Sequence, residues 1–437
     1  MSGVTSAAPR LGGCDAQALG ARFGTPLVVI DEGELRTTMR RFRHAFERPG
    51  WTASVTYAAK ALLLQAIARI AQEEMLWIDV CSGGELRTVL RAGVPAARCM
   101  LHGCNKTDDE LMLAVHSDIG FVVIDHAGEI DALANIAERA GRRMRVLVRV
   151  NPGIAAHTHH FVQTSAPDSK FGFAIEDGQA LVALAAVGAQ PSLRLCGIHC
   201  HIGSQIYDLG SYAHEIARLA AFAAVAGQRR GVRFDVVNVG GGLGVAEGAA
   251  VQAPTAQLWA DAVFGAFEKY FTGSGLGRPE IFVEPGRALV ALSGTTLYRV
   301  GVRKRLPDGT EAIIVDGGMS DNPRPALYEA QYAVSLPARA HAATDGSYTI
   351  FGRHCETDRL FRDVDLPAPQ PGDVIAVHGT GAYTYSMASN YNRFARPAVV
   401  LAANGCARLI ARREPLEHVL DLDVAAGAAE AQDAKPA

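Results

Sequence analysis

The sequence is poor in the features that mark exported, membrane-bound and nucleic-acid-binding proteins. Its 437 residues carry a net charge of −3, so they offer no basic field for a nucleic acid or an anionic membrane. No run reaches about 18 uninterrupted apolar residues, and the N-terminal segment lacks a basic stretch followed by an apolar run. We therefore expect a cytoplasmic protein that binds neither a membrane nor a nucleic acid.

The eight cysteines include no C-x-x-C pair, which argues against a zinc ribbon or a disulfide scaffold. Reduced thiols in the cytoplasm fit this distribution better. Hydrophobic residues make up 49% of the chain and charged residues 20%, which is a globular composition. A chain of this length exceeds one ordinary core, so two domains and a small-molecule site are the starting hypothesis.

Short β-branched apolar runs recur from residue 53 onward, and most precede a stretch with helical spacing, such as Leu62, Leu63, Ile67 and Ile70. Eight such units over roughly 230 residues predict a (β/α)8 barrel, which typically takes about 250 residues. A doubly wound open sheet would produce the same alternation. The expected strands are 53–57, 76–80, 98–102, 121–124, 146–150, 195–200, 234–239 and 281–283.

From about residue 291 the pattern changes to strands separated by Pro and Gly turns, at 295–303, 312–315, 347–351 and 373–378. The sequence therefore predicts a barrel over 28–290 and a mostly β domain over 291–423. Residues 1–27 are expected to pack on the β domain. Residues 424–437, rich in Ala, Glu and Asp, are expected to form a disordered tail.

Polar and glycine-rich segments follow the expected strands, at positions that converge on one mouth of a parallel barrel. Lys60 closes the first strand, where partial desolvation would lower the pKa of its amine and favour a Schiff-base nucleophile. A snorkelling surface lysine is the alternative. The run Gly240-Gly241-Gly242 would let backbone N–H groups approach a phosphate, and Ser204 could donate a hydroxyl hydrogen bond to the same phosphate. The alternative is that the glycines form an ordinary turn.

Acidic and imidazole side chains also stand at the strand ends. Glu284 could keep a heterocyclic nitrogen protonated, or be a simple turn residue. His201 could stack on a flat cofactor or move protons. Only one of His199 and His201 is expected to face the site, and no metal site is expected. Asp79 either orients that histidine or ends its strand.

With these motifs assembled, residues 20–410 resemble the fold-type III pyridoxal-phosphate (PLP) decarboxylases, and among them those that act on diaminopimelate. One departure is that Thr357-Asp358-Arg359 follows Cys355-Glu356, where the family usually has Ser-Gly-Asp. The motifs stand in the family's order at 57–60, 149–153, 157–159, 169–173, 199–205, 240–242, 284–287, 316–322, 324–328, 355–356, 381–383 and 390–392.

The resemblance implies a role for each site residue. Lys60 would bind PLP covalently, His201 would stack on its ring, and Glu284 would pair with the pyridine nitrogen. Arg287, Arg324 and Tyr328 would clamp the distal carboxylate of the substrate. Cys355 and Glu356 would enter from the partner subunit of a homodimer with shared active sites. The implied cofactor-binding residues are Lys60, Asp79, His201, Ser204, Gly240, Gly241, Gly242, Glu284 and Tyr383; the substrate-binding ones are Arg287, Arg324, Tyr328, Glu356 and Tyr383; the catalytic ones are Lys60, His201 and Cys355.

The expected reaction is decarboxylation of meso-2,6-diaminopimelate to L-lysine and CO2, as in lysine biosynthesis. The alternative is a decarboxylase of ornithine or lysine of either hand, because Asp358 could recruit a distal ammonium, whereas Arg287 and Arg324 favour a carboxylate. A racemase would place a cation against the ring nitrogen, which Glu284 opposes. A non-catalytic PLP carrier built on the barrel alone would not need the second domain.

Overall fold

The computed structural model describes residues 10–154, 169–246 and 252–424. The chain forms two compact units, one made of residues 30–295 with 378–386 and the other of 1–29, 296–377 and 387–437. The predicted boundary at residue 290 lies close to this division, but the prediction assigned 378–386 to the β domain, whereas this segment belongs to the barrel unit. The predicted motif at 157–159 and the tail residues 425–437 lie outside the described residues.

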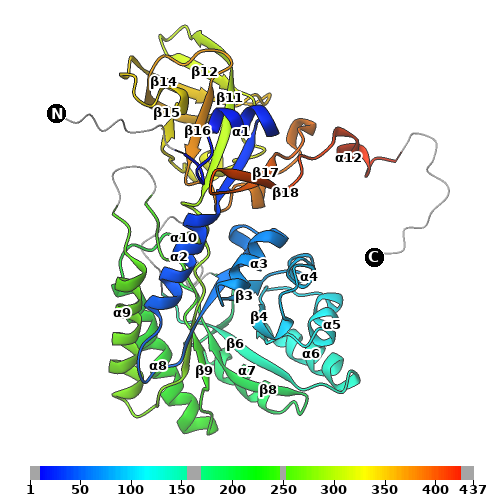
Figure 1. Ribbon diagram of the computed structural model, residues 1–437. Coiled ribbons are helices and arrows are strands. Elements are labelled where there is room, and N and C mark those ends of the chain that lie inside the picture. Colours follow the sequence, from blue (N-terminus) through cyan, green and yellow to red (C-terminus); the bar gives the residue numbers. More distant parts are fainter. Residues whose placement is uncertain (1–9, 155–168, 247–251, 425–437) are drawn as a thin grey trace. The chain divides into compact units, whose positions relative to one another are not determined.

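Eight parallel strands form a closed barrel, which confirms the predicted fold and excludes the open sheet (Figure 1). The strands pair in the order β5-β4-β3-β2-β10-β9-β8-β6, and β5 pairs with β6 to close the barrel. Each overlaps one predicted strand. They are β2 (Ala53–Ala58), β3 (Trp77–Val80), β4 (Cys99–Leu101), β5 (Phe121–Ile124), β6 (Met144–Asn151), β8 (Leu193–His199), β9 (Val236–Asn238) and β10 (Glu280–Val283), with the short β7 (Phe173–Ala174) beside β6.

The interior of the barrel is a packed core and not a channel. Inward-facing side chains from its strands form one buried cluster, against which Trp77 packs. Because these side chains fill the axis, a ligand site must lie at one end of the strands. The cluster consists of Met100, Phe121, Val123, Leu147, Cys196, Val236 and Phe282.

Helices follow the strands, and some of them begin at polar caps that the sequence provides. Ser82 caps α4, and Thr107 with Glu110 forms a reciprocal capping box at the start of α5. No helix in the described ranges is long and apolar enough to cross a membrane. The helices of this unit are α2 (Glu32–Ala45), α3 (Gln65–Glu73), α4 (Gly83–Arg91), α5 (Asp108–His116), α6 (Ala127–Arg139), α7 (Gln179–Gly188), α8 (Gly210–Arg230), α9 (Ala256–Phe267) and α10 (Arg287–Val290).

The second unit is mostly β, and its sheet includes a strand from the N-terminal segment. β1 (Leu27–Asp31) lies between β11 and β17 in the order β15-β14-β12-β11-β1-β17-β18, while β16 pairs with β11 and β13. Leu19 and Leu27 pack with Leu297 and Val400 in one of its apolar clusters. The other elements are β11 (Gly294–Arg305), β12 (Glu311–Val315), β13 (Val334–Ser335), β14 (Gly346–Phe351), β15 (Arg359–Leu366), β16 (Val374–His378), β17 (Ala398–Ala403), β18 (Cys406–Ala411), α1 (Ala16–Phe23), α11 (Arg324–Tyr328) and α12 (Leu416–Leu420).

Candidate active site

A pocket at the carboxyl ends of the barrel strands gathers most of the predicted cofactor-binding residues. Lys60 lies in a 3-10 turn directly after β2, His201 and Ser204 follow β8, and the glycine run follows β9. Parallel topology brings these segments to one end of the barrel, as expected for such a fold. The pocket is lined by Ala58, Lys60, His201, Ser204, Gly241, Gly242, Leu243, Glu284, Gly286, Arg287 and Tyr383.

The amine of Lys60 faces the carboxylate of Asp79, with 3.3 Å between Nζ and Oδ2. The Asp79 side chain is buried, whereas that of Lys60 is 42% exposed. Desolvation lowers the pKa of Lys60, but the attraction of Asp79 and other acidic neighbours outweighs it and holds this pKa well above its ordinary value. The predicted lowering is therefore wrong, because the pairing of β2 with β3 places an acid beside the amine. Asp79 forms a hydrogen bond with the lysine.

Glycine backbone and two polar side chains form one corner of the pocket. Gly240 and Gly242 have φ angles of 64° and 97°, which L side chains rarely adopt. A Cβ on Gly242 would lie 2.1 Å from a carbonyl oxygen of the loop after β8. Arg287 donates from Nη2 to Ser204 Oγ at 3.3 Å, and its guanidinium lies 4.8 Å from the ring centroid of Tyr383.

His201 presents a neutral ring to the pocket. Its Nδ1 accepts a hydrogen bond of 3.2 Å from the Gly241 N–H, and burial holds its pKa well below the ordinary value. Of His199 and His201, only His201 lines the pocket. On a continuous strand two residues at this spacing would share a face, but strand β8 ends at His199, which contacts Glu284.

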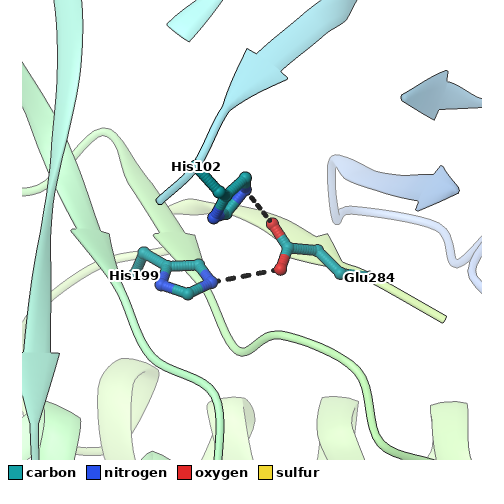
Figure 2. A group of neighbouring side chains, drawn as sticks. All are labelled: His102, His199 and Glu284. Atoms are coloured by element: carbon teal, nitrogen blue, oxygen red, sulfur yellow. Dashed lines mark hydrogen bonds and ion pairs between the residues drawn. The ribbon is translucent and has the colours of Figure 1, made fainter. Parts of the chain in front are cut away.

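Glu284 is buried, and its two carboxylate oxygens contact different strands of the barrel (Figure 2). Oε1 accepts from Asn238 Nδ2 at 2.6 Å and lies 3.0 Å from His102 Nε2. Oε2 lies 3.1 Å from His199 Nε2. His102, His199 and Glu284 are a group that could hold a metal ion, with ligand atoms within 4.8 Å of one another, but here each imidazole faces a separate carboxylate oxygen.

His102 and Asn238 are two site residues that the sequence analysis missed. Each is a polar residue at the carboxyl end of a strand that was predicted, His102 after β4 and Asn238 as the last residue of β9. The rule that led to Lys60 and Glu284 applies to both. Both fall inside the strands expected at 98–102 and 234–239, so neither was expected beyond a strand end.

The remaining predicted site residues lie in the β unit, within which they form two small groups. Arg324 is buried, donates from Nε to Tyr332 Oη at 2.9 Å and lies 5.1 Å from the ring centroid of Tyr328. Cys355 and Glu356 are exposed. The Cys355 N–H donates to an asparagine side chain, and Glu356 accepts from the hydroxyl of a tyrosine.

Asp358 is not available to a substrate. Its carboxylate accepts from the backbone N–H groups of Met319 at 2.8 Å and His354 at 3.1 Å, and it contacts His354 Nδ1 at 2.5 Å. The side chain is 1% exposed. The hypothesis that this acid recruits a distal ammonium is therefore wrong, because the carboxylate is already used to hold its own loop.

The barrel pocket fits pyridoxal phosphate. Lys60 offers a primary amine for the aldehyde, and Glu284 offers a carboxylate for a protonated ring nitrogen. The glycine run, with Ser204 and Arg287, offers donors for a phosphate. A Cβ on Gly241 would lie 1.9 Å from the Glu284 carbonyl oxygen, so this close backbone approach requires glycine.

The barrel and the chemistry of its pocket define a pyridoxal-dependent decarboxylase, and the chain belongs to that family. Residues 32–291 match the family described as "Pyridoxal-dependent decarboxylase, pyridoxal binding domain". The protein is therefore an enzyme that uses PLP.

Within the family the chain is similar to the diaminopimelate decarboxylases. It is 42% identical to that of Bacillus subtilis over 417 residues, which cover 95% of this chain and 94% of the relative. Diaminopimelate decarboxylase from M. jannaschii, solved in co-complex with L-lysine, has a TM-score of 0.88 and 32% identity, and the match covers 96% of this chain and 98% of that one. The Helicobacter pylori enzyme complexed with L-lysine has a TM-score of 0.84, 28% identity and coverage of 92% and 98%.

Proposed function

We propose that this enzyme decarboxylates meso-diaminopimelate to L-lysine and CO2, the last step that a lysine biosynthesis route would need. The observation that carries the proposal is the similarity to diaminopimelate decarboxylases along almost the whole chain, at 42% identity for the Bacillus subtilis relative. Two such enzymes were solved with L-lysine bound, which is the product of this reaction. The cytoplasm is the proposed compartment, where the eight free cysteines would stay reduced.

When bound, PLP supplies an electron sink that weakens the bond between Cα and the carboxylate of an amino acid. Lys60 would bind the aldehyde carbon through Nζ, with Asp79 orienting the amine. His201, whose ring is neutral, would cover one face of the cofactor.

Glu284 would accept the N–H of the cofactor ring. Burial alone would raise its pKa, but His102 and His199 together hold the pKa well below the ordinary value. The carboxylate is therefore ionised over the physiological pH range. An anion at this position keeps a ring nitrogen protonated and so supports withdrawal of electrons.

The phosphate would bind at the glycine run. Arg287 shares a hydrogen bond with Ser204, so both groups can face the same anion. We therefore assign Arg287 to the phosphate end together with Ser204, and the clamp on the distal carboxylate to Arg324 and Tyr328.

Arg324 suits a distal carboxylate because a guanidinium binds it through two parallel hydrogen bonds. The contacts with Tyr332 and Tyr328 fix its orientation. The Asp358 carboxylate accepts hydrogen bonds within its own loop, so it does not favour a substrate with a distal ammonium.

We further propose a homodimer with shared active sites. Cys355 and Glu356 are exposed on their own unit, as groups that reach a partner's site must be. In this arrangement Cys355 Sγ of one subunit would return a proton to Cα of the substrate in the other.

Release of CO2 from a panel of amino acids tests the proposed substrate. We expect turnover of meso-diaminopimelate and much weaker turnover of L- and D-lysine, L- and D-ornithine and L-arginine. Higher efficiency with any of the diamino acids would refute the substrate assignment and leave the class of enzyme intact.

A further inference from the structure

The carboxylate of Glu284 is held by groups to which no contact with the cofactor or the substrate has been assigned. Asn238 Nδ2 donates to Oε1 at 2.6 Å, and His199 Nε2 lies 3.1 Å from Oε2. Both residues end their strands, His199 on β8 and Asn238 on β9, and the two stand opposite each other in the register of this pair. Both are almost fully buried.

The surroundings of His199 determine which of its nitrogens carries the proton. Its Nδ1 is buried and has no hydrogen-bond partner among the described residues. A proton on Nδ1 would therefore be an unsatisfied buried donor, which is costly. Burial also lowers the pKa of His199 to about 4. The ring is thus neutral, with its single proton on Nε2, directed at Glu284 Oε2.

The amide of Asn238 is oriented in the same way. Its Oδ1 accepts from the Gly240 N–H at 2.9 Å, which leaves Nδ2 toward Glu284. The Glu284 N–H in turn donates to the Gly240 carbonyl at 2.7 Å. The glycine run and the acid are therefore joined through one hydrogen-bonded loop.

We propose that His199 and Asn238 are positioning residues that, together with His102, keep Glu284 ionised and that aim Oε2 at the ring nitrogen of the cofactor. Both donate to the anion without carrying a charge, so they stabilise it without neutralising it. Oε1 has two contacts and Oε2 has one, so Oε2 retains a lone pair for a further donor. The inference rests on the proposed role of Glu284.

A pair of variants at His199 separates the hydrogen bond from the bulk of the side chain. His199→Gln keeps an N–H donor near the position of Nε2, whereas His199→Leu fills similar space without one. Asn238→Leu removes the other donor and serves as a second test if a His199 variant fails to fold. Cys196→Ala, in the same strand and without contact to Glu284, controls for loss of core packing.

Each holoenzyme is reconstituted with PLP labelled with 15N in the ring, and the 15N chemical shift reports protonation of the ring nitrogen. We expect a protonated nitrogen in the wild type and in His199→Gln, and a shift toward the unprotonated value in His199→Leu and Asn238→Leu. Loss of a hydrogen bond to a charged group lowers kcat by roughly 10-fold to 100-fold if the bond acts in the transition state. We expect a loss of this size in the leucine variants, with little change in KM.

A wild-type 15N shift and kcat in both leucine variants, with PLP bound, would overturn the inference. Equal impairment of His199→Gln and His199→Leu would also overturn it, because the donor would then not matter. Glu284→Gln checks the premise: an unchanged 15N shift there would mean that another group protonates the ring, and the inference would fail. If the 15N shifts follow expectation but meso-diaminopimelate is not decarboxylated, the proposed substrate fails and the inference stands.

Discussion

Glu215 provides a quantitative test of how this barrel tolerates a buried acid. The residue lies on α8 with 0% of its surface exposed. Among the described residues, its carboxyl faces the Cys200 thiol and the neighbouring Tyr212. Burial raises the pKa of Glu215 from the ordinary 4.5 to about 8. The carboxyl is therefore protonated in the folded protein at neutral pH and ionised in the unfolded chain.

Since the folded pKa lies above the unfolded one, Glu215 contributes stability that is fully present below pH 4.5 and is lost as the pH rises to about 8. The pKa values differ by about 3.5 units, and each unit corresponds to about 1.4 kcal/mol. Ionisation of Glu215 therefore lowers the free energy of unfolding by about 5 kcal/mol over the whole pH range. About 4 kcal/mol of this loss falls between pH 5 and pH 8.

Glu215→Gln replaces the protonated acid by a neutral group of the same shape and removes this dependence. Urea unfolding of both proteins at pH 5, 6, 7 and 8 measures it, because the other titrating groups cancel in the difference. We expect the free energy of unfolding of the variant, taken relative to that of the wild type, to rise by about 4 kcal/mol between pH 5 and pH 8. Glu138→Gln, at an exposed position of α6, is the matched control and should follow the wild type. If Glu215→Gln and wild type lose stability in parallel, the reasoning is refuted.

Three further predictions concern the assigned residues. Borohydride reduction followed by peptide mapping should place the pyridoxyl group on Lys60; labelling of Lys106, whose amine is engaged by Glu129, would contradict the assignment. Arg324→Ala should raise the KM for meso-diaminopimelate by roughly 30-fold to several thousand-fold, the cost of truncating one side of a buried charge pair; an unchanged KM would exclude the clamp. Inactive Cys355→Ala and Lys60→Ala proteins should regain activity after subunit exchange, and exchanged heterodimers without activity would show that Cys355 serves its own chain.

The barrel strands could be predicted because each is a short apolar run between turn residues. Such a run predicts a strand whichever sheet it joins. The strands of the β unit were harder. β15 carries Arg359, Arg362, Asp363 and Asp365, so its charged residues mask its apolar ones, and β1 pairs with β11 and β17, which lie far from it in the sequence. Closure of the barrel also depends on long-range pairing, because an open sheet has the same alternation of elements.

The sequence by itself determined which groups stand at the strand ends: an amine at Lys60, a glycine run after β9 and an acid at Glu284. It could do so because these positions follow from local patterns and from the parallel topology. Only the tertiary structure decided what each group contacts. Strand pairing brings Asp79 to Lys60 and so raises a pKa that was expected to fall, and the tertiary structure places His199 on Glu284 while His201 lines the pocket. Protonation states and side-chain partners depend on distances of about 3 Å between residues far apart in the chain, which no local pattern encodes.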